Sequence, residues 1–323
     1  MKAFRIGWLA VALFANLLFA SGAVADALVV TQAMKASTIA EIFVEEDSIR
    51  VEIEVGVADV EAFRNLLPDE LYLKVAGESR PLKERLKTFL KDDWRITVEG
   101  ETLVGAIDSI QVARRIIRDE ITGQPLPNQP ADAENVIRTV LRYPLQDQPK
   151  SISIVPPTGP NNLSPANIGF VAYHKGVAVN DFRYLSGQET LQLDWSDPWY
   201  SAFDRRTLRR RYFAPAAAFI YVEDFEVRKE IIFRPKDLQQ WIDLGLDVAS
   251  LIRADQRETI RENVAAFLAQ HTPLKIDGQT REGPLDRVHF IERSLKTTGV
   301  VELDQDVDLD MAMIGAIYVY PIE

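Results

Sequence analysis

Apolar and polar residues alternate along residues 38–44 and again along residues 49–57, with the acidic residues Glu45, Glu46 and Asp47 between the two runs. Alternation with a period of two is typical of strands that bury one face, and a short polar break between two such runs indicates a turn. The pattern therefore predicts a β-hairpin near the start of the chain.

Two helices are predicted after this hairpin. Apolar residues at helical spacing mark residues 60–67 and residues 82–90. We expect Asp59 to cap the first of these helices. A strand over residues 95–98 then leads into Glu99-Gly100, a pair that suits a tight hairpin turn in which both residues adopt positive φ.

The same order of elements returns 178 positions later. Residues 42–113 align with residues 220–291 without a gap, and we count 18 identities in the 72 aligned pairs. Asp277-Gly278 occupies the second turn position, and the last strands, residues 136–143 and 314–320, each end in Tyr-Pro. The chain therefore reads as a tandem duplication.

The segment between the copies has no counterpart in either of them. Its alternating runs predict four strands, at residues 151–155, 168–173, 177–184 and 190–195. We expect an α+β fold of two duplicated, mainly antiparallel, sandwich-like domains, each with two inserted helices. The domains cover residues 26–149 and 212–323, and the extra β block, residues 150–211, packs on the first domain.

Residues 1–25 have the pattern of a secretory signal peptide. A basic start is followed by an apolar run over residues 6–20, and Ala23-Val24-Ala25 supplies the small residues of a cleavage site. The alternative is an uncleaved membrane anchor, although the apolar run is short for a bilayer. The pattern predicts a periplasmic or secreted protein that begins at Asp26.

The charge of the mature chain is strongly negative. The formal net charge of the whole sequence is −11, and removal of Lys2 and Arg5 changes it to −13. Such a surface disfavours nucleic acid and anionic membranes as partners. The sequence has no cysteine, so no disulfide supports the fold, and after residue 25 no apolar run is long enough to span a membrane.

A search for common catalytic motifs finds none. The sequence has no phosphate-binding loop, no nucleophile elbow, no zinc-protease motif and no cysteine nucleophile. His174, His271 and His289 are far apart in the chain, so a three-histidine metal site would need the fold to gather them. Whether the protein is an enzyme is left open, with a non-catalytic role favoured.

One stretch combines aromatic residues with carboxylates. It runs from Asp194 to Phe203, and the candidate ligand-binding residues in it are Asp194, Trp195, Asp197, Trp199 and Tyr200. Aromatic rings beside carboxylates suit sugar binding, and two carboxylates are also the minimum set of a glycosidase. The alternative is a turn whose aromatic residues seal the interface between the domains.

Two charged runs stand out near the second copy. Acidic residues alternate with apolar ones over residues 302–310, and Asp304, Asp306 and Asp308 are candidate ligands for Ca²⁺. The alternative is a strand with one solvated acidic face, because the spacing does not match an EF-hand loop. For the basic run over residues 205–211 we favour pairing within the chain, with the acidic stretch as one candidate partner, over binding of an acidic partner.

The start of the mature chain resembles the extracytoplasmic domain of the HupE/UreJ-like family. The likeness rests on Lys35-Ala36-Ser37, Ile42 to Asp47 and Ile49 to Asp59, about 25 residues in all. The membrane domain of that family has no counterpart here, and its metal-handling histidines have no match. The resemblance implies an exported protein that starts with a strand, a turn and a strand, and it carries no functional residue across.

Together these patterns predict a non-catalytic binding or scaffolding protein of the bacterial envelope with a protein or glycan partner. A carbohydrate-binding protein or glycoside-active enzyme that uses the aromatic turn is the first alternative, and a calcium-binding module is the second. Because the copies share their fold-forming residues, we expect a specific activity where the copies differ.

Overall fold

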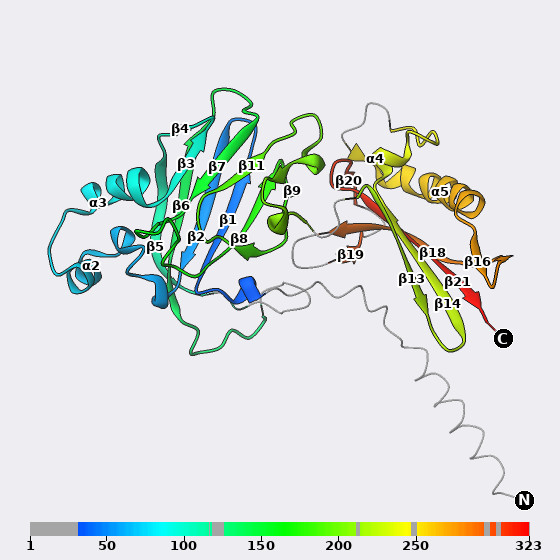
Figure 1. Cartoon of the computed structure of the whole chain (residues 1–323), viewed down its shortest axis with the longest axis horizontal. Helices are drawn as coiled ribbons and strands as arrows, with labels where there is room; N and C mark the ends of the chain where they lie inside the picture. The colour runs from blue at the N-terminus through cyan, green and yellow to red at the C-terminus, as the bar shows by residue number, and fades with distance from the viewer. Residues whose placement is uncertain are drawn as a thin grey trace, which may run out of the picture.

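A computed structural model of the chain describes residues 32–115, 117, 126–210, 214–246, 251–293, 298–301 and 305–322. The predicted signal peptide, residues 1–25, lies outside the described residues. Within them the fold is α+β, with mainly antiparallel strands and few helices, as predicted. Among the described helices, none is long and apolar enough to cross a membrane. We call residues 32–210 the first half and residues 214–322 the second half (Figure 1).

The larger sheet of the first half has the strand order β10-β8-β1-β2-β6-β5, with β9 paired to β8. Its strands are β1 (Thr38–Val44), β2 (Ser48–Val55), β5 (Ala106–Arg114), β6 (Asn135–Pro144), β8 (Ile168–His174), β9 (Val177–Ala178) and β10 (Arg183–Tyr184). The hairpin β1–β2 confirms the predicted strand-turn-strand. The strand β8 comes from the predicted β block, residues 150–211, and pairs with β1 in parallel, whereas the other pairs in this sheet are antiparallel.

A second sheet of the first half has the order β12-β11-β7-β3-β4. Its strands are β3 (Arg95–Val98), β4 (Glu101–Thr102), β7 (Ser151–Val155), β11 (Glu189–Gln192) and β12 (Ala202–Phe203). Buried residues of both sheets, such as Ile42 and Ile152, belong to one hydrophobic core. The β block therefore contributes strands to both sheets of the first half.

The second half is built on one sheet with the order β13-β14-β21-β18-β19. Its strands are β13 (Ala216–Val222), β14 (Glu226–Phe233), β18 (Leu285–Arg293), β19 (Thr298–Val300) and β21 (Met313–Pro321). Two small ladders lie outside this sheet. One pairs β15 (Leu251–Ile252) with β20 (Val307–Asp308), and the other pairs β16 (Leu274–Ile276) with β17 (Gln279–Arg281). The helix α5 (Arg257–His271) packs on the sheet and shares its core (Figure 1). The described part of this half thus differs from the sandwich-like packing we expect, because a helix takes the place of a second five-stranded sheet.

The two halves share the strand order and the register of their central strands. Ser48 lies opposite Pro144 between β2 and β6, and Glu226 lies opposite Pro321 between β14 and β21, which are the same positions after shifts of 178 and 177. A register shift at Asp108 in β5 also recurs at Asp286 in β18. The repeat in the sequence therefore falls on matching strands of the two halves.

Two local features explain why the same residue types recur in both halves, at the tight turns and at Gly105 and Gly283. Glu99 and Gly100 have φ values of 49° and 92°, and Asp277 and Gly278 have values of 52° and 78°, so both predicted turns are confirmed. A Cβ atom on Gly105 would lie 2.5 Å from Cε1 of Tyr143, and one on Gly283 would lie 2.5 Å from Cζ of Tyr320. In each half a tyrosine ring occupies the space that the glycine leaves.

The helices differ in part from the prediction. Residues 60–67 form turns and a short 3₁₀ segment, and the first α-helix, α2 (Asp69–Ala76), comes after them. The sequence pattern missed α2 because its apolar residues alternate and are exposed, with Tyr72 as its one buried residue. The other helices are α3 (Leu82–Thr88), which continues as a π-helical turn over Phe89–Asp93, and α4 (Pro235–Leu238). The predicted helix over residues 82–90 is confirmed.

Asp59 does not cap a helix, contrary to our expectation. Its buried carboxylate accepts a hydrogen bond from the hydroxyl of Thr38 at 2.7 Å and one from the backbone N–H of Asn167 at 3.0 Å. Asp59 therefore ties the start of β1 to the residue that precedes β8. In the second half, Asp237 has different partners.

Candidate functional site at the junction of the halves

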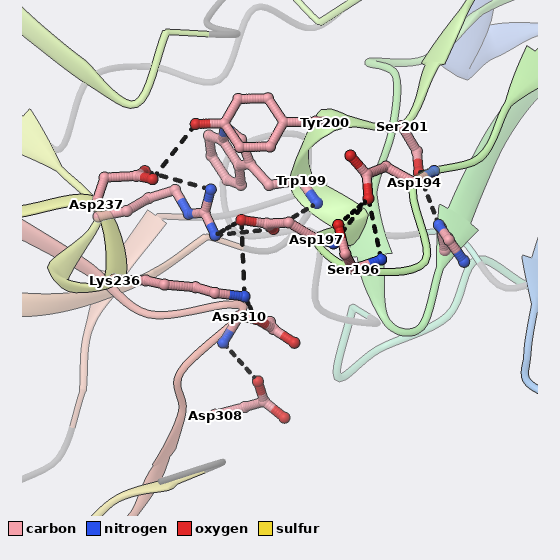
Figure 2. A network of polar contacts seen from close by, with 12 residues as sticks. Asp194, Ser196, Asp197, Trp199, Tyr200, Ser201, Lys236, Asp237, Asp308 and Asp310 are labelled. Carbon is pink, nitrogen blue, oxygen red and sulfur yellow. Dashed lines mark hydrogen bonds and ion pairs between the residues drawn. The ribbon is translucent and has the colours of Figure 1, made fainter. Parts of the chain in front are cut away.

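The aromatic turn lies where the two halves meet, and it begins with Asp194. One carboxylate oxygen of Asp194 accepts hydrogen bonds from the backbone N–H and the hydroxyl of Ser196 and from the backbone N–H of Asp197 (Figure 2). These bonds, the one from the Ser196 hydroxyl first, lower the pKa of Asp194. Asp197 then caps the 3₁₀ turn Pro198–Tyr200 by accepting a hydrogen bond from the backbone N–H of Trp199 at 3.2 Å.

Arg234 is the main partner of this turn in the second half. It follows β14 directly, its side chain is 0% exposed, and one of its terminal nitrogens donates to both carboxylate oxygens of Asp197, each at 3.0 Å. The other terminal nitrogen lies 3.3 Å from Asp237. The guanidinium group also lies over the rings of Trp199 and Tyr200, at 4.8 and 5.7 Å from the ring centroids. A buried cation of this kind is stable only with such partners.

Lys236 extends the same network toward the acidic stretch. Its ammonium group lies 3.6 Å from Asp197 and 2.5 Å from Asp310 (Figure 2). The hydroxyl of Tyr200 donates to Asp237 at 3.3 Å. Burial raises the pKa of Asp237, and the nearby guanidinium group of Arg234 opposes that shift. The network therefore joins three carboxylates and two cations from both halves.

A small apolar cluster adjoins the polar network. It contains Val177 and Trp199 from the first half and Met313 from the second half, all buried, with the half-buried Ile232 and Met311 against them. Trp199 also lies under the guanidinium group of Arg210, at 4.0 Å from the ring centroid. The junction thus combines apolar burial with a shielded ion-pair network.

Trp195 faces the interior of the first half. Its indole N–H donates to the backbone carbonyl of Pro149 at 2.7 Å, and its ring meets the imidazole of His174 edge-on at 4.4 Å between centroids. The five candidate residues therefore divide into two groups. Asp197, Trp199 and Tyr200 contact the second half, whereas Asp194 and Trp195 stabilise the turn from the side of the first half.

The structure brings together one pair that the sequence did not indicate, namely His174 and Ser201. Nδ1 of His174 lies 2.7 Å from Oγ of Ser201, which also accepts a hydrogen bond from the backbone N–H of Asp194 at 2.9 Å. Burial lowers the pKa of His174 to about 4. A serine and a histidine at this distance resemble part of a hydrolase site, yet both side chains are buried, so a substrate has no direct access to the hydroxyl. The pair is 27 positions apart, and no motif marks it.

The calcium candidates have partners of their own. Asp304 lies outside the described residues. Asp306 accepts a hydrogen bond from the backbone N–H of Ala254 at 3.0 Å, and Asp308 accepts one from that of Asp310 at 2.8 Å. The described part of the stretch forms the two-residue strand β20 and a turn, in place of a longer strand. Within the described ranges, no three histidine or acidic side chains gather as metal ligands.

Three arginines of the basic run have partners in the first half. Arg205 forms an ion pair with the buried Glu189 at 2.8 Å. Burial raises the pKa of Glu189, and Arg205 opposes this shift. Arg209 and Arg210 donate to the backbone carbonyls of Phe203 and Trp199. Arg211 lies outside the described residues. The acidic stretch pairs with Lys236 through Asp310.

A surface groove lies between α3 and β5 in the first half. Its volume is about 490 Å³, and its lining consists of Leu82, Lys83, Leu86, Lys87, Leu90 and Ile107. The two lysines are exposed, and the apolar residues are half-buried. Such a lining suits an apolar segment that carries acidic groups.

An exposed strand edge is the second surface with a distinct chemistry. Among the described strands of the second half, β13 is the edge of the sheet, and its residues Ile220 and Val222 are 56% and 76% exposed. The residues at the same positions of the first half, Ile42 and Val44, are 0% exposed. The difference arises because β8 covers β1 and a second sheet packs on its inner face.

No family model matches this chain, and the search of curated proteins finds no match. The resemblance of the N-terminal stretch to HupE/UreJ-like proteins thus stays a prediction. A role for the protein has to be argued from the junction, the groove and the strand edge.

Proposed function

We propose that this protein is an exported, non-catalytic binding or scaffolding protein of the bacterial envelope. In this proposal the chain arose by tandem duplication, and the second copy took on binding when it lost the covering strands that the first copy retains. The observation that carries the proposal is the exposed apolar edge β13, at a position where the first half has a paired and buried strand.

The physical argument starts from the cost of an exposed strand edge. Unpaired N–H and C=O groups together with apolar side chains favour pairing with another strand. Proteins that bind peptides by strand addition use such an edge, where main-chain hydrogen bonds supply affinity and side-chain pockets supply specificity. Ala218, Ile220 and Val222 would supply the side-chain contacts in this case.

The junction supports a scaffolding role because it holds the halves in one arrangement. The ion pair of Arg234 with Asp197 is shielded from water, and Trp199 packs beside it. An edge in the second half and a groove in the first half are then presented at a defined spacing. A partner held at one surface lies at a set position relative to the other.

The same contacts argue against sugar binding and sugar hydrolysis at the aromatic turn. The ring of Trp199 has the guanidinium groups of Arg210 and Arg234 over it, and Asp197 is engaged by Arg234 and Lys236. A sugar would have to displace these groups before it could stack on the ring. A hydrolase activity of the purified protein that Asp197→Ala abolishes while the fold is retained would overturn the proposal.

A peptide with the sequence of residues 166–176, which contains β8, tests the proposed edge directly. Because β8 pairs with β1, and β13 has the same place in its sheet as β1, we expect one labelled peptide to bind per chain in dilute protein, where no second copy occupies β13. The variant Ile220→Lys should lose this binding in fluorescence anisotropy. The matched control Leu163→Lys, which changes an exposed loop residue, should keep it. If neither the peptide nor a second copy of the chain binds at β13, the proposal fails.

A further inference from the structure

We propose that the partner of β13 is the β13 strand of a second copy of this chain. The two strands would pair antiparallel about a two-fold axis at Phe219 and join the two second-half sheets into one. This inference rests on the proposed binding function and names the partner of its strand edge. The argument uses the direction of the backbone groups, the composition of the strand and the sizes of its side chains.

The hairpin geometry sets which backbone groups of β13 point outward. The backbone N–H of Glu223 donates to the carbonyl of Glu226 at 2.9 Å, which makes these residues a hydrogen-bonded pair. Hydrogen-bonded and non-hydrogen-bonded pairs alternate along an antiparallel ladder. The backbone groups of Ala216, Ala218, Ile220 and Val222 therefore point away from β14, toward the open edge.

The first half shows that outward groups at these positions pair with a strand. Thr38 and Val44 are the counterparts of Ala216 and Val222 at the 178-residue shift. The backbone N–H of Thr38 donates to the carbonyl of Asn167 at 3.0 Å, and the carbonyl of Val44 accepts from the N–H of Lys175 at 2.9 Å. In that half β8 occupies the whole edge of β1.

The composition of β13 lacks the usual protection of an edge strand. Natural edge strands carry lysine, proline, a bulge or an inward charge that prevents pairing with another chain. The seven residues of β13 are Ala-Ala-Ala-Phe-Ile-Tyr-Val, and the ladder with β14 is regular over its full length. The strand is thus suited to be paired.

The side chains of β13 complement those of the same strand in antiparallel orientation. When the seven residues overlap fully, Ala216 lies opposite Val222, Ala217 opposite Tyr221, Ala218 opposite Ile220, and Phe219 opposite its own copy. Small residues thus face large ones in every row except the central one, and the central aromatic pair is of a kind that stabilises a sheet. This internal complementarity favours a second copy over an unrelated strand.

The full overlap also satisfies the backbone and the charges. The rows that join the even-numbered residues are the hydrogen-bonded ones, so about eight main-chain bonds would form. These rows contain no charged residue, and Glu223 and Asp224 would lie beyond them, near Pro215 and Ala214 of the other copy. Like charges are therefore not brought face to face, although each mature chain carries a predicted net charge of −13.

The absence of cysteine from the chain allows a test by cross-linking. Phe219 would lie in a non-hydrogen-bonded row opposite its own copy, with about 4.5 Å between the Cα atoms, which is within the range of a disulfide. We expect Phe219→Cys to form a disulfide-linked dimer under mild oxidation. Glu41→Cys, the matched position in β1, should form no disulfide-linked dimer because β8 occupies that edge.

Sedimentation of the protein without a cysteine substitution keeps the test independent of folding defects in the variant. We expect a concentration-dependent dimer that Ile220→Lys converts to monomer, whereas Leu163→Lys leaves it a dimer. A monomer at all concentrations that binds the β8 peptide would overturn the second-copy inference and leave the proposed function standing. A monomer that binds no peptide would overturn both. A dimer that cross-links through Glu41→Cys but not through Phe219→Cys would also overturn the inference.

Discussion

Arg234 and Asp197 lie 37 positions apart in the chain, and one guanidinium nitrogen of Arg234 donates to both carboxylate oxygens of Asp197 at 3.0 Å. The arginine is fully buried, so it depends on this carboxylate and on Asp237 for compensation of its charge. The two halves meet at this contact, and its removal has a defined energetic consequence.

We expect Asp197→Ala to lower the free energy of unfolding by about 3–5 kcal/mol, because it leaves a buried guanidinium group short of a partner. Urea denaturation followed by circular dichroism would measure the loss. Asp108→Ala is the control, since the pair of Asp108 with Arg142 is exposed and should contribute about 0–1 kcal/mol. The double variant Asp197→Leu with Arg234→Met should recover most of the stability. If Asp197→Ala and Asp108→Ala lowered the free energy of unfolding equally, the role assigned to Arg234 would be contradicted.

The buried His174 makes stability depend on pH. Burial lowers its pKa in the folded protein to about 4, whereas the ordinary value is 6.5. Between these values the unfolded chain binds more protons, so stability falls as the pH falls from 6.5 toward 4. We expect the loss between about pH 7 and pH 5 to be roughly 2 kcal/mol smaller in His174→Asn than in the wild type. Urea titrations at both pH values measure this difference. His271→Asn, a change at an exposed position, should follow the wild type, and an unchanged pH dependence in His174→Asn would refute the expectation.

The paired glycines and tyrosines predict matched effects in the two halves. Gly105→Ala and Gly283→Ala should each destabilise the protein by about 1–3 kcal/mol, because the added methyl group overlaps the ring of Tyr143 or Tyr320. Thermal unfolding would show the loss. Gly159→Ala is the control, since its Cβ would meet its nearest neighbours at ordinary contact distance, 3.5 Å or more. Two neutral variants at the paired positions would show that the rings can move aside.

Asp59 connects two strands that are far apart in the chain. We expect Asp59→Ala to cost about 1–3 kcal/mol, since it leaves the hydroxyl of Thr38 and the backbone N–H of Asn167 without their acceptor. Hydrogen exchange should then become faster in β8 than in β6. A uniform increase across the first half would argue against a local role of Asp59.

Calcium gives a simple test of the acidic stretch. Asp306 and Asp308 accept backbone hydrogen bonds, and Asp310 is paired with Lys236, so we expect about 1 mM CaCl₂ to leave the melting temperature unchanged. Differential scanning fluorimetry with MgCl₂ as the control would show this. A calcium-specific rise that Asp308→Asn removes would establish the metal site instead.

Local rules predicted the hairpins and turns because the residues that determine them are neighbours in the chain. The positive φ values of Glu99-Gly100 and Asp277-Gly278 illustrate this. The helix α2 was missed because its exposed apolar residues alternate as in a strand. The pairing of β8 with β1, the bonds of Asp59 and the contact of Arg234 with Asp197 join distant segments, so no local pattern could show them.

The difference between the halves was also beyond the reach of pattern analysis. Residues 220–222 and 42–44 have nearly the same sequence, yet Ile220 and Val222 are exposed whereas Ile42 and Val44 are buried. Their burial is decided by the strands that cover them, which lie elsewhere in the chain. For the same reason the candidate residues Asp197, Trp199 and Tyr200 could be placed in a turn, but their partners in the second half could not be named.

β21 follows the other described strands of the second half in the chain, yet it lies in the middle of its sheet, between β14 and β18. During synthesis the chain emerges N-terminus first, so β14 and β18 are made before β21 and lack their shared neighbour until β21 follows. The first half meets the same requirement earlier, since its central strand β6 precedes more than half of the chain. A chaperone that binds the newly made polypeptide would therefore have to protect β14 and β18 until β21 is available.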